Sequence, residues 1–215
     1  MRNSTALAHV ERTQIIAIIR GDLCGLGIQI GEVLHAAGIT AMEVSLVSPD
    51  AVATIQLLAQ QFGDRAAIGA GTVLRSDEVD QVYDAGASFI VSPNCNEAVI
   101  SRTLQRGMAS FPGAYTATEI THATELGADA VKLFPAVSLG PGYVSALRAP
   151  FPALRLVPTG GINLSNIRQY LEAGAVAVGV GSELVNPREF ANLNERALYD
   201  RALALVAAKT GNHEG

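Results

Sequence analysis

Short apolar segments alternate with longer amphipathic segments along most of this 215-residue chain. A glycine that can end a helix, followed at once by an apolar segment, recurs at Gly38, Gly63, Gly86, Gly107, Gly127 and Gly174. The last interval is twice as long as the others, and Pro150 and Pro152 near its midpoint can end a helix in the same way. A repeat in which each strand is followed by a helix is typical of βα units and a parallel sheet.

The apolar segments predict eight strands, the number that closes a barrel. Their residues are 14–20, 41–46, 66–70, 88–92, 108–111, 130–134, 154–159 and 175–180. Helical spacing with capping residues at the start predicts helices at 50–61 and 76–85, and residues 1–12 read as a short amphipathic helix. We expect an α/β fold in one domain over residues 1–215: a single (β/α)8 TIM barrel with a short N-terminal helix.

A doubly wound open sheet has the same alternation of strands and helices. Its dinucleotide signature, Gly-x-Gly-x-x-Gly after the first strand, is absent, because Gly21, Gly25, Gly27 and Gly31 have the wrong spacing. The barrel is therefore the favoured fold.

The composition limits the kinds of molecule that this protein is expected to bind. The net charge is -5 and no run of lysines or arginines occurs, so nucleic acid and membrane are not expected, while a small anionic ligand is compatible. No segment has the length of a membrane span, and the first residues lack the apolar core of a signal peptide. Cys24 and Cys95 fit neither a disulfide framework nor a zinc site, so we expect free thiols in a reducing cytoplasm.

Lysine is rare in this sequence, which has Lys132 and Lys209 against thirteen arginines. Lys132 lies inside the apolar run 130–135, where a charged side chain is costly. An arginine keeps its proton under cellular conditions, whereas a lysine in apolar surroundings gives it up and becomes a nucleophile. The alternatives are a lysine that reaches solvent between helices and one paired with a structural carboxylate.

Glu43 is a second ionisable residue in the middle of a predicted apolar strand. Together with Lys132 it forms either a structural ion pair or a catalytic pair. Schiff-base chemistry needs both groups, since a neutral amine attacks a ketone and a base then moves protons on and off the intermediates.

Polar residues late in barrel strands meet at the carboxyl-end face, where barrels carry their active sites. Arg20, Glu43, Thr72, Lys132 and Thr159 have this position. Two glycine-bearing turns, 158–163 and 179–182, follow the last two predicted strands, where a phosphate can bind backbone amides and a following helix start. The alternative is that these glycines only make tight turns.

The chain resembles the 2-keto-3-deoxy-6-phosphogluconate (KDPG) aldolase family, which includes the 2-keto-3-deoxy-6-phosphogalactonate enzymes. The similarity covers residues 15–185. It rests on Met42-Glu43-Val44-Ser45-Leu46, Val131-Lys132-Leu133-Phe134-Pro135 and Pro158-Thr159-Gly160-Gly161, with segments 69–74, 91–93, 111–113 and 116–119.

The resemblance implies a class I aldolase without metal or cofactor that cleaves a 2-keto-3-deoxy-6-phospho sugar acid to pyruvate and glyceraldehyde 3-phosphate. Lys132 corresponds to the Schiff-base lysine and Glu43 to the general acid/base. The family pattern places Thr72, Pro93 and Phe134 around the pyruvate part, and Gly160, Gly161 and Ser182 at the phosphate; Thr159 and Gly181 in the same turns are further candidates. It also implies a homotrimer.

Two departures from the pattern leave the substrate open between gluconate and galactonate types. Val47 stands where gluconate-type enzymes usually carry an arginine for the substrate carboxylate, and Arg20 can take over with a bidentate contact. This arrangement, with segments 48–50 and 140–143, is similar to the galactonate type, whereas Thr159 is similar to the gluconate type.

Four other functions compete with this interpretation. An aldolase for a related 2-keto-4-hydroxy acid would share the chemistry. A metal-dependent aldolase would need ligands grouped at strand ends, but His9, His35, His122 and His213 lie in predicted helices or the tail. A phosphosugar isomerase or synthase would not need the buried lysine, and a silent sugar-phosphate-binding barrel would keep Lys132 and Glu43 as a structural pair.

Overall fold

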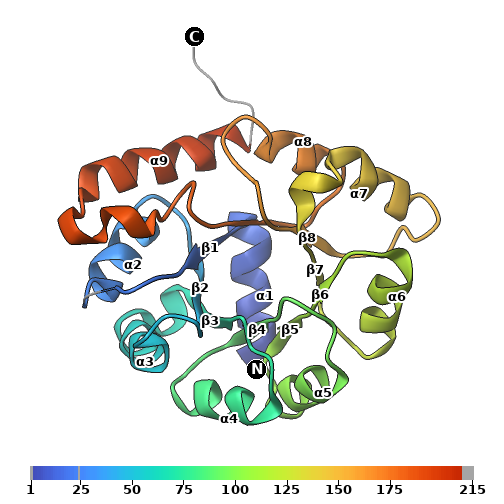
Figure 1. Ribbon diagram of the computed structural model, residues 1–215, viewed down its shortest axis with the longest axis horizontal. Helices are drawn as coiled ribbons and strands as arrows, with labels where there is room; N and C mark the ends of the chain where they lie inside the picture. Colours follow the sequence, from blue (N-terminus) through green and yellow to red (C-terminus); the bar gives the residue numbers. More distant parts are fainter. Residues whose placement is uncertain (1, 24, 210–215) are drawn as a thin grey trace.

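The computed structural model describes residues 2–23 and 25–209. Strands and helices alternate along the chain, and Figure 1 shows the strands in the middle with helices around them. The α-helices are α1 (Arg2–Thr13), α2 (Gly27–Ala36), α3 (Ala51–Phe62), α4 (Ser76–Asp84), α5 (Glu97–Gln105), α6 (Ala117–Glu125), α7 (Pro141–Arg148), α8 (Ile167–Glu172) and α9 (Glu195–Ala208). The 3-10 helices are η1 (Gly63–Arg65), η2 (Ala136–Ser138) and η3 (Pro187–Asn192).

The strands are β1 (Ile15–Ile19), β2 (Ala41–Ser45), β3 (Ala67–Gly71), β4 (Phe89–Val91), β5 (Ala109–Phe111), β6 (Gly113–Ala114), β7 (Val131–Leu133), β8 (Leu156–Pro158) and β9 (Val178–Val180). Within the described residues they form a six-stranded sheet, β5-β4-β3-β2-β1-β9, and a three-stranded sheet, β6-β7-β8. Every strand pair is parallel. The predicted α/β fold with parallel strands is confirmed, and the strands form a curled parallel sheet.

The structure contains one strand, β6, that the sequence did not predict. The segment 108–111 continues beyond its predicted end, and Pro112 separates β5, which pairs with β4, from β6, which pairs with β7. Proline has no N–H to donate to a ladder, but its carbonyl oxygen still accepts from Lys132 N–H at 2.8 Å. A bridge between Thr159 and Gly179 connects the three-stranded sheet to β9.

Two apolar clusters lie on opposite sides of the strands. The larger cluster packs the outer strand faces against the surrounding helices and includes Val131 and Leu133 of β7. The smaller cluster contains Ala6 and Val10 of α1 together with inward residues of the strands. Alternation of side chains along each strand produces these two faces, and α1 closes the inner one at the amino ends of the strands.

The other expectations on helices agree with this structure. The helices predicted at 1–12, 50–61 and 76–85 are α1, α3 and α4, within two residues at either end.

Cys95 is a free, half-buried thiol. Cys24, His213 and the tail 210–215 lie outside the described residues. In the ranges 2–23 and 25–209, no helix combines the length and apolarity needed to span a membrane.

His9 ties α1 to the amino ends of the strands. Its Nε2 donates to the carbonyl oxygen of Asp64 at 3.0 Å, while Nδ1 accepts from the Arg12 guanidinium at 2.8 Å and lies 3.0 Å from Thr40 Oγ1. Burial, the largest cause, lowers the pKa of His9 below its ordinary value of 6.5. At a pH above 6.5 the folded protein therefore holds a neutral imidazole at this position.

We expect the stability that depends on His9 to be present above pH 6.5, the ordinary pKa, and to fall as pH decreases through the lower folded-state pKa. The unfolded chain takes up a proton in that window before the folded chain does. Denaturant unfolding of the His9→Gln variant should lack this part of the pH dependence. The exposed His122→Gln on α6 is the control and should keep the wild-type pH dependence; equal slopes in His9→Gln and wild type would contradict the expectation.

Candidate active site

A cavity of about 460 Å³ opens at the carboxyl ends of the strands. All site residues predicted from the sequence line it: Arg20, Glu43, Thr72, Pro93, Lys132, Phe134, Thr159, Gly160, Gly161, Gly181 and Ser182. They come from strands far apart in the chain. The structure therefore brings the whole predicted set to one place, as the carboxyl-end rule for barrels requires.

Lys132 lies on the inner face of β7 and is only 7% exposed. Its neighbours Val131 and Leu133 pack outward in the larger cluster, which leaves Lys132 directed toward the cavity. The Nζ atom is 5.1 Å from the centre of the Phe134 ring. The alternative of a lysine that reaches solvent between helices is therefore wrong.

Glu43 lies on β2 and is 3% exposed. Its carboxylate occupies the space left by Gly71 on the neighbouring strand, where an added Cβ would come within 2.8 Å of Glu43 Oε1. Burial raises the pKa of Glu43 above its ordinary value of 4.5, and the charges of Lys132 and Arg20 oppose that rise only in part. This carboxyl group is thus easier to protonate than an exposed glutamate.

Lys132 and Glu43 interact through their charges without forming an ion pair. Across the described residues, no salt bridge or hydrogen bond joins these two side chains, although each lines the same cavity. A structural pair would be held together by direct contact, because an isolated buried charge is costly. Each side chain instead lines the cavity without an ion pair to the other.

Arg20 follows β1 at the rim of the cavity. The backbone after it is held to the next βα loop, because Gly21 N–H donates to the buried Ser48 Oγ at 3.0 Å. Val47, where the family pattern usually has an arginine, is exposed and does not line the cavity. Arg20 is thus the guanidinium that faces this space.

The two glycine turns lie on the side of the cavity formed by β8 and β9. Gly160 and Gly161 have φ of 91° and 80°, a left-handed conformation that favours glycine, and a Cβ on Gly161 would come within 2.5 Å of Val137. The next regular elements begin only at Ile167 and Pro187. The expected helix start is therefore not at either turn.

Outside the two glycine turns, sequence reasoning missed five lining residues: Ile18, Ser45, Glu183, Val185 and Pro187. Ser45 could have been found, because it lies two positions after Glu43 and therefore on the same face of β2. Glu183 follows Ser182, next to the glycine turn 179–182. Val185 and Pro187 lie beyond any strand, so no periodic pattern marks them.

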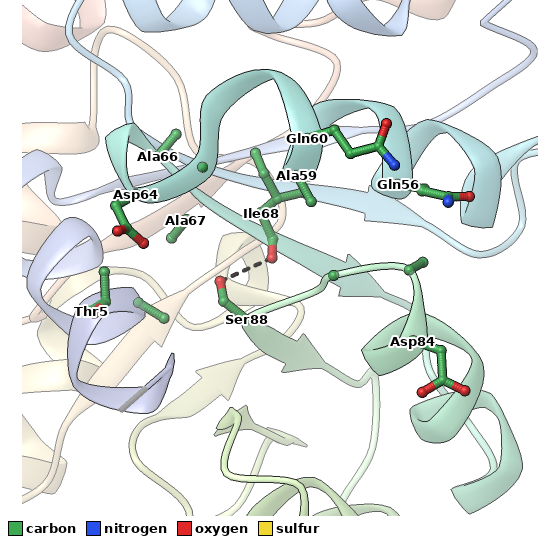
Figure 2. A pocket seen from close by; sticks show the side chains of 14 residues that line it. Thr5, Gln56, Ala59, Gln60, Asp64, Ala66, Ala67, Ile68, Asp84 and Ser88 are labelled. Atoms are coloured by element: carbon green, nitrogen blue, oxygen red, sulfur yellow. Dashed lines mark hydrogen bonds between the residues drawn. The ribbon is translucent and has the colours of Figure 1, made fainter.

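A second cavity, of about 610 Å³, lies at the amino ends of the strands between α1, α3 and α4 (Figure 2). Its charged residues are Asp64 and Asp84, and Ser88 Oγ donates to the carbonyl oxygen of Ile68 at 3.0 Å. It offers neither a nucleophile nor a base beside a cation. Although larger, it lacks the chemistry of the carboxyl-end cavity.

The three histidines among the described residues lie away from the carboxyl-end cavity. His9 is part of the α1 network, His35 stacks on Phe62 with ring centres 5.3 Å apart, and His122 lies on α6. Over residues 2–23 and 25–209, no three His, Cys, Asp or Glu side chains are grouped so as to hold a metal ion.

The profile of one aldolase family, KDPG and KHG aldolase, matches residues 7–198. The chain belongs to this family. It is accordingly an enzyme of the aldehyde-lyase class, as the residues around Lys132 and Glu43 predict, and the resemblance to KDPG and phosphogalactonate aldolases is confirmed.

The relatives include proteins named for each of the two substrate types. The chain is 40% identical to the 2-dehydro-3-deoxy-6-phosphogalactonate aldolase of Escherichia coli K12, over 79% of this chain and 83% of that one. It is 37% identical to the 2-dehydro-3-deoxy-phosphogluconate aldolase of Treponema pallidum, over 87% and 89%. Among solved structures, the Legionella pneumophila KDPG aldolase with pyruvate captured as a covalent carbinolamine matches with TM-score 0.85 at 29% identity, over 93% and 97%.

Gly71→Ala tests whether the space beside Glu43 matters to this aldolase. The new methyl group would displace the carboxylate, the movable end of its side chain, so we expect a folded protein whose kcat/KM falls about 10- to 100-fold, as misplaced catalytic groups do. Aldol cleavage assays and thermal unfolding measure both effects. Gly142→Ala on α7, where nothing lies within 4 Å, is the matched control; equal activities in the two variants would contradict the expectation.

Proposed function

We propose that the chain is a class I aldolase that cleaves a 2-keto-3-deoxy-6-phospho sugar acid to pyruvate and glyceraldehyde 3-phosphate through a Schiff base on Lys132. The observation that carries this proposal is the placement of Lys132 and Glu43, which are buried on different strands and face one cavity without an ion pair. The carbinolamine captured in the Legionella pneumophila relative supports the same chemistry.

In the proposed reaction, neutral Lys132 attacks the C2 ketone and the carbinolamine loses water to give an iminium ion. Glu43, acting through a water molecule, removes the proton of the C4 hydroxyl. The C3–C4 bond breaks, its electrons pass into the iminium, and glyceraldehyde 3-phosphate leaves. The resulting enamine is protonated at C3 and hydrolysed, which releases pyruvate and regenerates the free amine.

The lining of the cavity supports the division of the substrate into two ends. Thr72, Pro93 and Phe134 would surround the pyruvate part, with Arg20 at its carboxylate. The turns with Thr159, Gly160 and Gly161 and with Gly181 and Ser182 would hold the phosphate through backbone N–H groups. A guanidinium at Arg20, with Val47 at the position that usually carries an arginine, favours the galactonate type. Thr159 favours the gluconate type. The proposal therefore covers both configurations at C4.

The proposal also includes the oligomeric state and the closure of the barrel. The bridge between Thr159 and Gly179 and the bond from Lys132 N–H to Pro112 support joining the two sheets into one eight-unit barrel. A homotrimer in the cytoplasm, acting on a phosphorylated keto acid and pyruvate, stays a prediction from the family resemblance. So does the single domain over residues 1–215.

Trapping with pyruvate and borohydride tests the central step. We expect reduction to fix pyruvate on Lys132 and the Lys132→Arg variant to lose activity about a thousandfold or more, because an arginine cannot act as the nucleophile. Peptide mass mapping locates the adduct. Lys209 is an internal control, since its Nζ donates to the carbonyl oxygen of Thr13 at 2.8 Å and lies outside the cavity. An unmodified Lys132, or full activity of the arginine variant, would overturn the proposal.

The pH dependence tests the role of Glu43. Because burial raises the pKa of Glu43 above 4.5, falling pH should protonate the base and reduce kcat/KM at a pH higher than for an ordinary glutamate. Glu43→Gln should lose this acid limb and about 10²- to 10⁴-fold in kcat. Pre-steady-state and steady-state rates across pH measure both. Glu172→Gln on α8, an exposed glutamate paired with Arg168, should behave as wild type; an acid limb retained in Glu43→Gln would rule out this role.

A further inference from the structure

Two hydroxyl groups form a hydrogen bond beside Glu43 in the active-site cavity. Ser45 Oγ lies 2.7 Å from Thr72 Oγ1, and both residues line the cavity. Ser45 is 1% exposed and shares the inner face of β2 with Glu43. Ser45 is therefore the buried member of the pair, and Thr72 is the more accessible one.

Thr72 has an unusual backbone conformation for a β-branched residue, with φ of 60°. The chain is held on both sides of it, because Leu46 N–H donates to the Gly71 carbonyl oxygen at 2.8 Å and Val73 N–H to that of Val91 at 3.3 Å. Strained residues of this kind persist where surrounding contacts determine them, and they occur most often at functional sites. The bond to Ser45 is the side-chain contact that accompanies this conformation.

We propose that Ser45 is a positioning residue that orients the hydroxyl group of Thr72 toward the keto acid, an inference that rests on the proposed aldolase function. When Ser45 donates its proton to Thr72 Oγ1, the Thr72 proton is free to point into the cavity and donate to a carboxylate or carbonyl oxygen of the substrate. Successive donors of this kind strengthen one another.

The surroundings of Ser45 favour this direction of donation. Among the described residues, Thr72 is the partner of the Ser45 side chain, and Thr159, the other buried hydroxyl of the cavity, already donates to the Val157 carbonyl oxygen at 3.2 Å. A buried hydroxyl needs an acceptor for its proton, so Ser45 is left with Thr72. The substrate then takes the donor that Thr72 still offers.

A double-mutant cycle tests the proposal in the full chain, with Ser45→Ala, Thr72→Val and the double variant. We expect Ser45→Ala to lower kcat/KM for cleavage about tenfold, mainly through a higher KM, because the interaction is made with the bound keto acid as well as the transition state. The double variant should be no worse than Thr72→Val, since the two residues act as a unit. Ser45→Thr, which keeps the hydroxyl, should stay within about threefold of wild type.

Ser110→Ala on β5 is the matched control, a buried strand serine that does not line the cavity. Thermal unfolding checks each variant, and where Ser45→Ala does not fold, Ser45→Cys replaces it with the same expected loss. Wild-type kinetics in Ser45→Ala, losses that multiply in the double variant, or failure of Ser45→Thr to restore KM would each overturn the role of Ser45. Pyruvate trapping on Lys132 in the wild type separates these outcomes from a failure of the aldolase proposal itself.

Discussion

The burial of two opposite charges without direct contact is the constraint on which this active site depends. Lys132 and Glu43 lie on separate strands whose hydrogen-bonded ladders fix the positions of their backbones. Removal from water raises the pKa of Glu43, and the positive charge of Lys132 limits that rise. An ion pair would engage both groups with each other, whereas here both side chains line the same cavity without one.

Glycines on the inner strand faces create the room for larger groups. Gly71 accommodates the Glu43 carboxylate, Gly69 lies against the Phe89 ring, and a Cβ at Gly179 would come within 2.4 Å of Thr159 Oγ1. Parallel strands present side chains toward a narrow interior, where only some positions can carry bulk. Small residues are therefore needed on the inner strand faces, beside the polar side chains Glu43 and Thr159 as well as beside the apolar ring of Phe89.

The contacts that stabilise the fold and the groups proposed for catalysis lie at opposite ends of the strands. At the amino ends, α1 closes the inner apolar cluster and His9 connects it to the strands through Asp64 and Thr40. At the carboxyl ends, the loops carry Arg20, the strained Thr72 and the glycine turns around the cavity. In barrel enzymes generally, the loops at the carboxyl ends determine the substrate while the opposite end maintains the fold. The relatives of this chain include proteins named for the gluconate type and for the galactonate type.

The sequence by itself determined the order of strands and helices and the two residues that stand out chemically, because periodic burial and a charge inside an apolar run are local properties of a chain. It also carried the family motifs around Lys132 and Glu43. The break of a strand at Pro112, the absence of an ion pair and the bond between Ser45 and Thr72 were decided only by the tertiary structure. Distances across strands follow from register and packing, which no single segment encodes, so contacts between residues far apart in the chain exist only once the sheet has formed.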